Sequence, residues 1–389
     1  MFRIESKTNN LYKTINLLRK FSVPLILGVI TALVWANTAP QSYNIFIKSD
    51  LIMGHNLYFF VNDVFMAFFF GLAGAELVQG FMPGGPLNPV RKAINPLIAS
   101  LGGVIGPIIF YLIFNSLFGT PDLLKGWGIP TATDIALAWL AARLIFGAAH
   151  SAVKFLLMLT IADDIIGLVI IAVFYPEPLH PVQPIYLLLI PVAMGTAFIL
   201  RKIGVQNYWV YLLTAGLLSW IGLYHAYLHP SLALFFIVPF LPHPNNYKKP
   251  LFKRISRSTL ERFKYQWDII VDFGLFMFGL TNAGINIFLF NTVTWMVLLS
   301  LLLGKTIGIS LFASIANIVG FPLPSGMKKK DLIMAGLIAA MGLTVALLIS
   351  GAAFTDTYLQ SAAKMGALLS VSAAPIAFIL SRVIGIRAR

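Results

Sequence analysis

Long runs of apolar residues, separated by short polar segments, make up most of this chain. An α-helix rises about 1.5 Å per residue, so about 20 apolar residues are enough to cross the hydrocarbon core of a bilayer. Because about twelve runs reach or approach this length, the pattern predicts an all-α polytopic membrane protein with about twelve transmembrane helices. The predicted spans are residues 21–37, 57–80, 93–115, 126–146, 152–175, 183–200, 206–223, 226–241, 268–288, 292–318, 331–353 and 361–385.

The composition supports this interpretation. Hydrophobic residues make up 58% and charged residues 11% of the 389 residues, and the mean hydropathy is +0.85, which excludes an ordinary soluble domain. The chain contains no cysteine, so disulfides, thiolate metal ligands and a cysteine nucleophile are excluded. We therefore expect residues 1–389 to form a single membrane transport domain.

The net charge of +14 comes from basic residues that gather in alternate connections between the runs, whereas only Lys48, Lys125 and Lys364 fall in the intervening ones. Since cytoplasmic loops carry an excess of lysine and arginine, this one-sidedness predicts an even number of spans with both termini in the cytoplasm. Residues 21–37 lack a clear signal-peptidase site, so we interpret them as the first span. The basic set includes Arg91, Lys92, Arg143, Lys154, Arg201, Lys202, Lys248, Lys249, Lys253, Arg254, Arg257, Arg262, Lys264, Lys328, Lys329, Lys330, Arg382, Arg387 and Arg389.

Residues 242–267 form the longest polar insertion, and we expect them to be a cytoplasmic basic loop. Two hypotheses remain open for this loop. In the first, the loop lies on anionic lipid headgroups. In the second, it is a solvated connection whose charge enforces the topology.

Two of the predicted spans contain weak helix formers near their middle. Residues 128–134 include a proline, two threonines and an acid, and residues 341–344 read Met-Gly-Leu-Thr. Both interruptions fall in the middle of a group of three runs, at approximately residues 93–175 and 292–385. Interrupted spans in corresponding positions are typical of transporters built from inverted repeats, with the substrate site at the repeat interface. The sequence therefore predicts two inverted repeats with broken helices.

Asp163 and Asp164 lie together near the middle of the run at residues 152–175. A carboxylate at the centre of a membrane helix costs about 2.5–3.5 kcal/mol on insertion scales, so such residues mark ion or proton sites more often than structural hydrogen bonds between helices. Asp134 and Lys305 also fall near the centres of their runs, and we expect all four to share one depth. With Thr133 they form a candidate site for a hard cation or a proton, in which Lys305 neutralises one acid.

Lys305 lies in the sequence Gly304-Lys305-Thr306-Ile307-Gly308, which resembles a phosphate-binding loop only superficially. A phosphate-binding loop would need a glycine at position 299, where this chain has Leu299. It would also need a preceding strand, and none is predicted here. The two glycines instead predict a close approach by a neighbouring helix, for which we favour the span that carries Asp163 and Asp164.

These motifs together resemble the NhaA family of sodium/proton antiporters, and the resemblance covers nearly the whole chain. It implies an all-α fold with broken helices and a secondary active, electrogenic exchange of Na⁺ or Li⁺ for H⁺ by alternating access. It further implies a multi-pass protein of the bacterial inner membrane that serves sodium and pH homeostasis, has no cofactor or enzyme activity, and forms a homodimer. The matching segments are Asn62-Asp63, residues 126–136, Asp163-Asp164, Asn282-Ala283-Gly284, residues 304–312 and Gly342-Leu343-Thr344.

The resemblance also implies roles for individual residues. Asp164 is expected to be the principal ligand of the transported Na⁺, and Asp163 the second acid, which alternates between ligand, proton carrier and partner of Lys305. Thr133 and Asp134 are expected to line and balance the break in the fourth span. The small cations are then substrates.

The chain departs from the family at the end of the second span. Glu76 is present, but the run of basic and acidic residues expected after it is replaced by Leu77-Val78-Gln79-Gly80. Because the resemblance links those charges to activation by pH, we predict an altered or weak pH response. Glu76, His229 and Asp63 are candidates for pH response or for lining the funnel, and Asp272 receives no role from the pattern.

Two other functions remain as alternatives. One is a sodium- or proton-coupled carrier of another solute, although Lys305 is the only base near the midplane and this disfavours an anionic substrate. The other is a membrane sensor that does not transport, which the missing charges favour and the intact acids oppose. An intramembrane hydrolase is disfavoured because no serine or histidine accompanies the acids.

Overall fold

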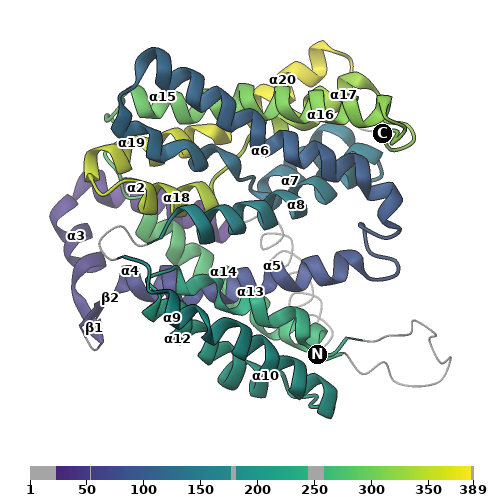
Figure 1. The fold of residues 1–389 in the computed structure, drawn as a ribbon. Coiled ribbons are helices and arrows are strands. Elements are labelled where there is room, and N and C mark those ends of the chain that lie inside the picture. Colours follow the sequence, from purple (N-terminus) through teal and green to yellow (C-terminus); the bar gives the residue numbers. More distant parts are fainter. Residues whose placement is uncertain (1–22, 53, 177–180, 244–257, 387–389) are drawn as a thin grey trace, which may run out of the picture.

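The computed structural model describes residues 23–52, 54–176, 181–243 and 258–386, and nearly all of its regular structure is helical. The strands in this part of the chain are a short antiparallel pair, β1 (Asp50–Ile52) and β2 (His55–Asn56). Figure 1 shows the helices lying side by side, with the β1–β2 hairpin at one end of the molecule and the connection between α5 and α6 at the other. We call the latter the basic end, because Arg91, Lys92 and Lys328 lie at the helix termini there.

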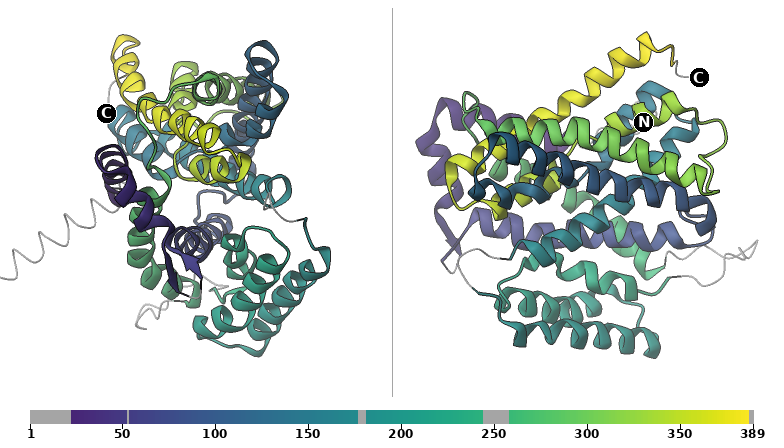
Figure 2. Two further views of the ribbon diagram at one scale, coloured as in Figure 1. Left: turned by 90° about the vertical axis from the view of Figure 1, so that its left-hand side faces the viewer. Right: turned by 45° about the horizontal axis from the view of Figure 1, so that its top comes forward.

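The helices form two groups, which the end-on view separates clearly (Figure 2). The first group, called the core bundle below, consists of α6 (Val90–Phe118), η2 (Pro121–Thr131), α7 (Ile135–Phe146), α8 (Ser151–Phe174), α15 (Thr292–Leu299), η6 (Ser300–Lys305), α16 (Thr306–Ile318), α17 (Lys329–Ile338), α18 (Thr344–Ala353), α19 (Thr357–Leu369), η7 (Ser370–Ser372) and α20 (Ala373–Val383).

The second group, called the side bundle, has its own cluster of buried apolar residues around Tyr211, Ile237 and Phe263. Its helix α14 packs closely against α2. Gly28 of α2 meets the backbone of α14, and Gly279 of α14 meets the backbone of α2. The side bundle consists of α2 (Val23–Thr38), α3 (Pro40–Lys48), α4 (Leu57–Phe59), η1 (Phe60–Phe65), α5 (Met66–Phe81), α9 (Pro184–Leu187), α10 (Leu189–Ile203), α11 (Tyr208–Tyr211), η3 (Leu212–Gly216), α12 (Leu217–His225), η4 (Pro230–Leu232), α13 (Ala233–Ile237), η5 (Val238–Phe240) and α14 (Thr259–Asn282).

The structure confirms a helical protein with several membrane-crossing segments. Within the described residues, six helices are long and apolar enough to cross a membrane, and η2 with α7 adds a seventh if the bent pair counts as one span. Helical segments cover each predicted run wherever it is described, but several of them are shorter or more polar than a standard span. The number of twelve spans therefore stays a prediction.

Both predicted helix interruptions are confirmed. The first separates η2, which ends at Thr131, from α7, which begins at Ile135, and the two axes differ by 55°. The second separates α17 from α18 over residues 339–343. The two breaks meet, because the Asp134 N–H donates to the Met341 carbonyl across 2.7 Å. Backbone groups freed by one break thus find partners in the other.

Glycines bring α6 and α16 into backbone contact, which corrects the expectation about Gly304 and Gly308. A Cβ added at Gly308 would lie 2.0 Å from the Gly102 carbonyl oxygen, and one at Gly106 would lie 2.2 Å from the Gly304 carbonyl oxygen. The helix that approaches these glycines most closely is therefore α6, not α8 with its two aspartates. The sequence shows that a close neighbour exists but not which helix it is.

The expected loop at residues 242–267 is also corrected in part. Helix α14 begins at Thr259, so the last residues of that segment are helical, and residues 244–257 lie outside the described chain. Ser258 and Glu261 form a reciprocal capping box at its start. This pairing satisfies two backbone N–H groups that would otherwise lack partners, which explains why a helix begins within a charged stretch.

The α6–α16 contact yields a test with a matched control. Gly106→Ala places a methyl group against the Gly304 carbonyl, whereas a Cβ at Gly195 in α10 meets nothing within 4 Å. Overpacking costs about 1–3 kcal/mol, so we expect Gly106→Ala to lower the melting temperature in detergent and Gly195→Ala to leave it unchanged or raise it slightly. Equal melting temperatures for the two variants would show that the close contact is not required.

Candidate functional site

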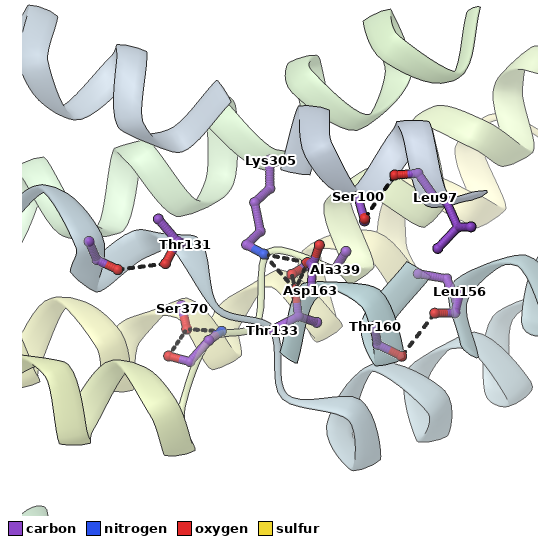
Figure 3. Close-up of polar contacts among 12 residues, drawn as sticks. Leu97, Ser100, Thr131, Thr133, Leu156, Thr160, Asp163, Lys305, Ala339 and Ser370 are labelled. Carbon is purple, nitrogen blue, oxygen red and sulfur yellow. Dashed lines mark hydrogen bonds and ion pairs between the residues drawn. The ribbon is translucent and has the colours of Figure 1, made fainter. Parts of the chain in front are cut away.

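A fully buried ion pair joins the middle of α8 to the end of η6. Lys305 Nζ lies 2.8 Å from Asp163 Oδ2, and both side chains are 0% exposed. Lys305 also donates to Thr133 Oγ1 at 2.6 Å. The Thr133 hydroxyl in turn lies 2.8 Å from Asp163 Oδ2 and 2.9 Å from the Ala339 carbonyl. Figure 3 shows these groups converging at the two helix breaks.

The local backbone places each member of this cluster. Lys305 ends the π-helix η6, a geometry that is rare and frequent at functional sites. Thr133 lies in the extended segment between η2 and α7, and Ala339 directly follows α17. Because neither break is helical there, hydroxyl and carbonyl oxygens point toward the charges instead of into a helix. The breaks therefore supply the polar surroundings that two charges inside a membrane need.

Asp134 caps the N-terminus of α7. Its Oδ1 accepts the Leu137 N–H at 3.1 Å. A negative charge at this position interacts favourably with the positive end of the α7 dipole. Asp134 thus lies at the break, and its charge-balancing role remains an expectation.

Asp164 points in a different direction from Asp163. It lines a cavity of about 10 Å³ with Glu76, Ile135, Ile161 and Phe235. We call this space the Asp164 cavity. It lies between α7 and α8 of the core bundle and α5 and α13 of the side bundle. Successive residues on an α-helix differ by about 100° in direction, which explains why the two adjacent acids have different partners in this structure.

The four charged residues therefore do not form a single cluster. Asp163 and Lys305 pair with each other, Asp134 caps a helix, and Asp164 faces its own cavity. No group of three acidic, histidine or cysteine side chains suited to hold a metal ion occurs within the described ranges. A cation at Asp164 would have to take its remaining ligands from water or other oxygens.

A larger cavity of about 650 Å³ lies at the basic end, and we call it the basic-end cavity. Its lining includes Gln79, Gly84, His243, Glu261 and Lys264. Glu76 and Ile161 line both this cavity and the Asp164 cavity. These two residues therefore stand where a path from the basic end to Asp164 would narrow.

An ion pair crosses this narrow point. Lys264 Nζ of α14 lies 2.9 Å from Glu76 Oε1 of α5, and it also donates to Gln79 Oε1 at 3.5 Å. The sequence analysis places Lys264 only among the basic residues of the cytoplasmic connections. The only signal was its position near the start of a charged helix, which does not identify a partner 188 residues away.

His243 contributes no fixed charge to the basic-end cavity. Burial lowers its pKa below the ordinary value for histidine, and the nearby Arg201 guanidinium lowers it further, against an opposing hydrogen bond to the Leu241 backbone. Near neutral pH the imidazole is therefore uncharged. Lys264 is then the cation that faces Glu76 in this cavity.

The remaining candidates lie away from the ion pair. His229 precedes η4 and hydrogen-bonds the Tyr175 backbone, and its Nε2 has no partner within the described chain. Asp63 belongs to the π-helix η1, and its backbone carbonyl accepts a hydrogen bond from Trp220 Nε1 at 2.9 Å. Asp272 is a half-buried residue of α14. None of the three is among the residues that line the two cavities described above.

Comparisons with known proteins agree over nearly the whole length. A sequence model of the family described as Na⁺/H⁺ antiporter 1 matches residues 14–381. The Na(+)/H(+) antiporter NhaA of Desulfitobacterium hafniense is 58% identical over 377 residues, which cover 96% of this chain and 97% of that protein. The Na(+)/H(+) antiporter NhaA of Geobacter metallireducens is 56% identical, with 96% and 99% covered.

A solved structure is similar in fold. The sodium proton antiporter MjNhaP1 of Methanocaldococcus jannaschii superimposes with a TM-score of 0.53 at 18% sequence identity, covering 93% of this chain and 91% of that one. At this identity the likeness concerns the fold alone.

The buried ion pair predicts a stability difference. Lys305→Met leaves the Asp163 carboxylate without its counter-charge, and breaking a buried pair costs about 3–5 kcal/mol. The double variant Lys305→Met/Asp163→Asn removes both charges, so we expect it to melt at a higher temperature than the single variant. Lys264→Met, which breaks a half-exposed pair, serves as the control and costs about 0–1 kcal/mol. A single variant as stable as the unmodified protein would contradict the proposed energetic weight of the pair.

Proposed function

The chain belongs to the Na⁺/H⁺ antiporter 1 family and exchanges Na⁺ for H⁺ across a membrane, and from this premise we propose that Asp164 is the group at which the two ions compete. One observation carries this assignment. Asp164 faces a cavity that shares Glu76 and Ile161 with the basic-end cavity, whereas the Asp163 carboxylate is already bound by Lys305. A carboxylate oxygen is a favourable ligand for hard cations such as Na⁺ and Li⁺, and it also binds a proton.

The volume of the Asp164 cavity suits one small occupant. A space of about 10–15 Å³ on the same measure holds about one water molecule, and this cavity measures about 10 Å³. Its other walls are mainly apolar, including Ile135, Ile165 and Leu168. A bound Na⁺ would therefore keep few of its waters and depend strongly on the Asp164 charge.

We assign Asp163 and Lys305 a supporting role that changes during the cycle. When Asp164 is protonated, Asp163 stays paired with Lys305. When Na⁺ arrives, Asp163 turns from the lysine to the cation, and Thr133 and Asp134 hold the break in place. Because several titratable groups share this region, more than one proton can leave for each Na⁺ that enters, which makes the exchange electrogenic.

Alternating access follows from the position of the site between the two bundles. A movement of the core bundle against the side bundle would close the path through the basic-end cavity and open one on the opposite side. We propose that residues 93–175 and 292–385 are the inverted repeats that make the two states equivalent. Each contains a broken helix in its middle, and the two breaks contact each other.

The membrane orientation follows from charge. We propose that the basic end faces the cytoplasm, with both termini and residues 242–258 on that side. The protein then lies in the bacterial inner membrane and expels Na⁺ or Li⁺ against H⁺, in support of sodium and pH homeostasis. A homodimer and contacts with anionic lipid are part of the same proposal.

The ion pair at the narrow point bears on the pH response. Family members are expected to carry further charges after Glu76, and here Lys264 provides the counter-charge from α14 instead. The run of basic and acidic residues that the family resemblance links to activation by pH is absent after Glu76 in this chain. We therefore maintain that pH regulation is weak in this chain.

The first test measures exchange directly. Purified protein in proteoliposomes with an imposed pH gradient receives Na⁺, Li⁺ or K⁺ while a pH-sensitive dye is followed. We expect Na⁺ and Li⁺ to dissipate the gradient and Asp164→Asn to reduce the rate by at least about 100-fold, because losing even an outer partner of a metal ligand costs about 10- to 100-fold. Asp356→Asn is the control, since Asp356 only caps α19 at an exposed position. A folded, fully active Asp164→Asn variant would refute the assignment.

The second test addresses the Glu76–Lys264 pair. We expect the Na⁺-driven dye response to change little between about pH 6.5 and pH 8.5, and a steep rise would contradict this. Lys264→Met leaves Glu76 unpaired at the narrow point and should lower the apparent KM for Na⁺ by about two- to fivefold. Glu76→Gln should raise the apparent KM by a similar factor. Both changes are of the size expected for a half-exposed ion pair. Shifts in the same direction would contradict an electrostatic role.

A further inference from the structure

Tyr175 joins the end of α8 to the outer half of the first broken span. It is the residue directly after α8, and its side chain is buried. Its hydroxyl accepts the Gly128 N–H at 2.7 Å and donates to the Lys125 carbonyl at 2.8 Å. Both backbone groups belong to η2, so one side chain hydrogen-bonds the helix at two points.

The fit between Tyr175 and η2 leaves no space for a residue larger than glycine at position 128. A Cβ added at Gly128 would lie 2.6 Å from the Tyr175 ring. From the other side, the buried Tyr111 of α6 donates to the Leu123 carbonyl at 2.8 Å, and its hydroxyl lies 2.2 Å from a Cβ added at Gly126. Two tyrosines from different helices thus hold η2 between them.

This arrangement compensates for the weakness of η2 itself. A 3₁₀-helix of eleven residues is unusually long, because its hydrogen bonds are poorly aligned. Hydrogen bonds from Tyr111 and Tyr175 use backbone groups that a regular α-helix would satisfy internally. The position of η2 is therefore set by its neighbours more than by its own backbone.

The position of η2 determines where Thr133 lies. Thr133 follows the Gly128 N–H by five residues, and the Thr131 hydroxyl fixes the intervening turn by donating to the Gly128 carbonyl at 2.7 Å. Thr133 in turn contacts Asp163 and Lys305. Since Asp163, Asp164 and Tyr175 all belong to α8 or its C-cap, the same helix carries the acids and the side chain that fixes the opposite wall of the site.

We propose that Tyr175 is a positioning residue for ion exchange, whose hydroxyl holds η2 so that Thr133 and Asp134 keep their places relative to the acids of α8. The inference rests on the proposed role of those acids and adds a residue remote from them. A site held by hydrogen bonds at a distance loses affinity when the support is loosened, even if all of its own ligands remain.

The test compares Tyr175→Phe with Tyr211→Phe in the same proteoliposome assay. Tyr211 is also fully buried and donates to a backbone carbonyl, Val205 O at 3.1 Å, but it lies in the side bundle and its removal leaves η2 untouched. We expect Tyr175→Phe to raise the apparent KM for Na⁺ about three- to tenfold with the maximal rate within about twofold. Loosening should affect the two ions unequally, so the ratio of the KM values for Li⁺ and Na⁺ should also change. Tyr211→Phe should leave both KM values unchanged.

A second variant covers the case in which Tyr175→Phe does not fold. Thr131→Val keeps the size of the side chain and removes the hydroxyl that fixes the turn after Gly128, so it should raise the KM in the same direction. If either folded variant lowers the melting temperature while both KM values and their ratio stay unchanged, Tyr175 is only a structural cap and the inference is wrong. An active Asp164→Asn variant would instead refute the function proposed for the acids, which separates the two failures.

Discussion

The cost of placing an ammonium and a carboxylate out of reach of water governs the architecture around Lys305. Both groups are fully buried, and a buried pair persists only when further hydrogen bonds satisfy what the two charges leave unpaired. Regular helices cannot provide such bonds, because their carbonyl groups are used within the helix. The two interrupted spans provide them, through the Thr133 hydroxyl and the Ala339 carbonyl. The helix breaks and the buried charges therefore require each other.

The two adjacent aspartates divide the work of the site. In this structure Asp163 is bound by Lys305 and Thr133, and Asp164 lines the small cavity next to Glu76. Were both paired to bases, no group would be left to bind the substrate. If neither acid were paired, two adjacent carboxylates would lie within the membrane without a counter-charge. Because the two side chains point in different directions around the α8 axis, one acid can pair with Lys305 while its neighbour faces the cavity.

Much of this could be predicted from the sequence, and the rest could not for identifiable reasons. Weak helix formers at residues 128–134 and 341–344 located both breaks, because backbone propensity is a local property. The pairing of Lys305 with one acid was expected from burial cost, which does not show which acid faces the lysine; Asp163 was named only through the resemblance to the family. The Glu76–Lys264 pair and the contact of Tyr175 with η2 join residues far apart in the chain, and only the packing of the helices reveals them. The same holds for the partner of Gly304 and Gly308, which is α6.

The glycine contact between α6 and α16 also determines how this molecule can deform. Side chains between two helices act as a compressible layer that allows small sliding movements, and here that layer is missing because backbone meets backbone at Gly102, Gly106, Gly304 and Gly308. The two helices are therefore stiff toward shear and translate as one block. Lys305 directly follows Gly304, one of the glycines in this contact. Any displacement of the block is then transmitted to the ammonium group without being absorbed along the way.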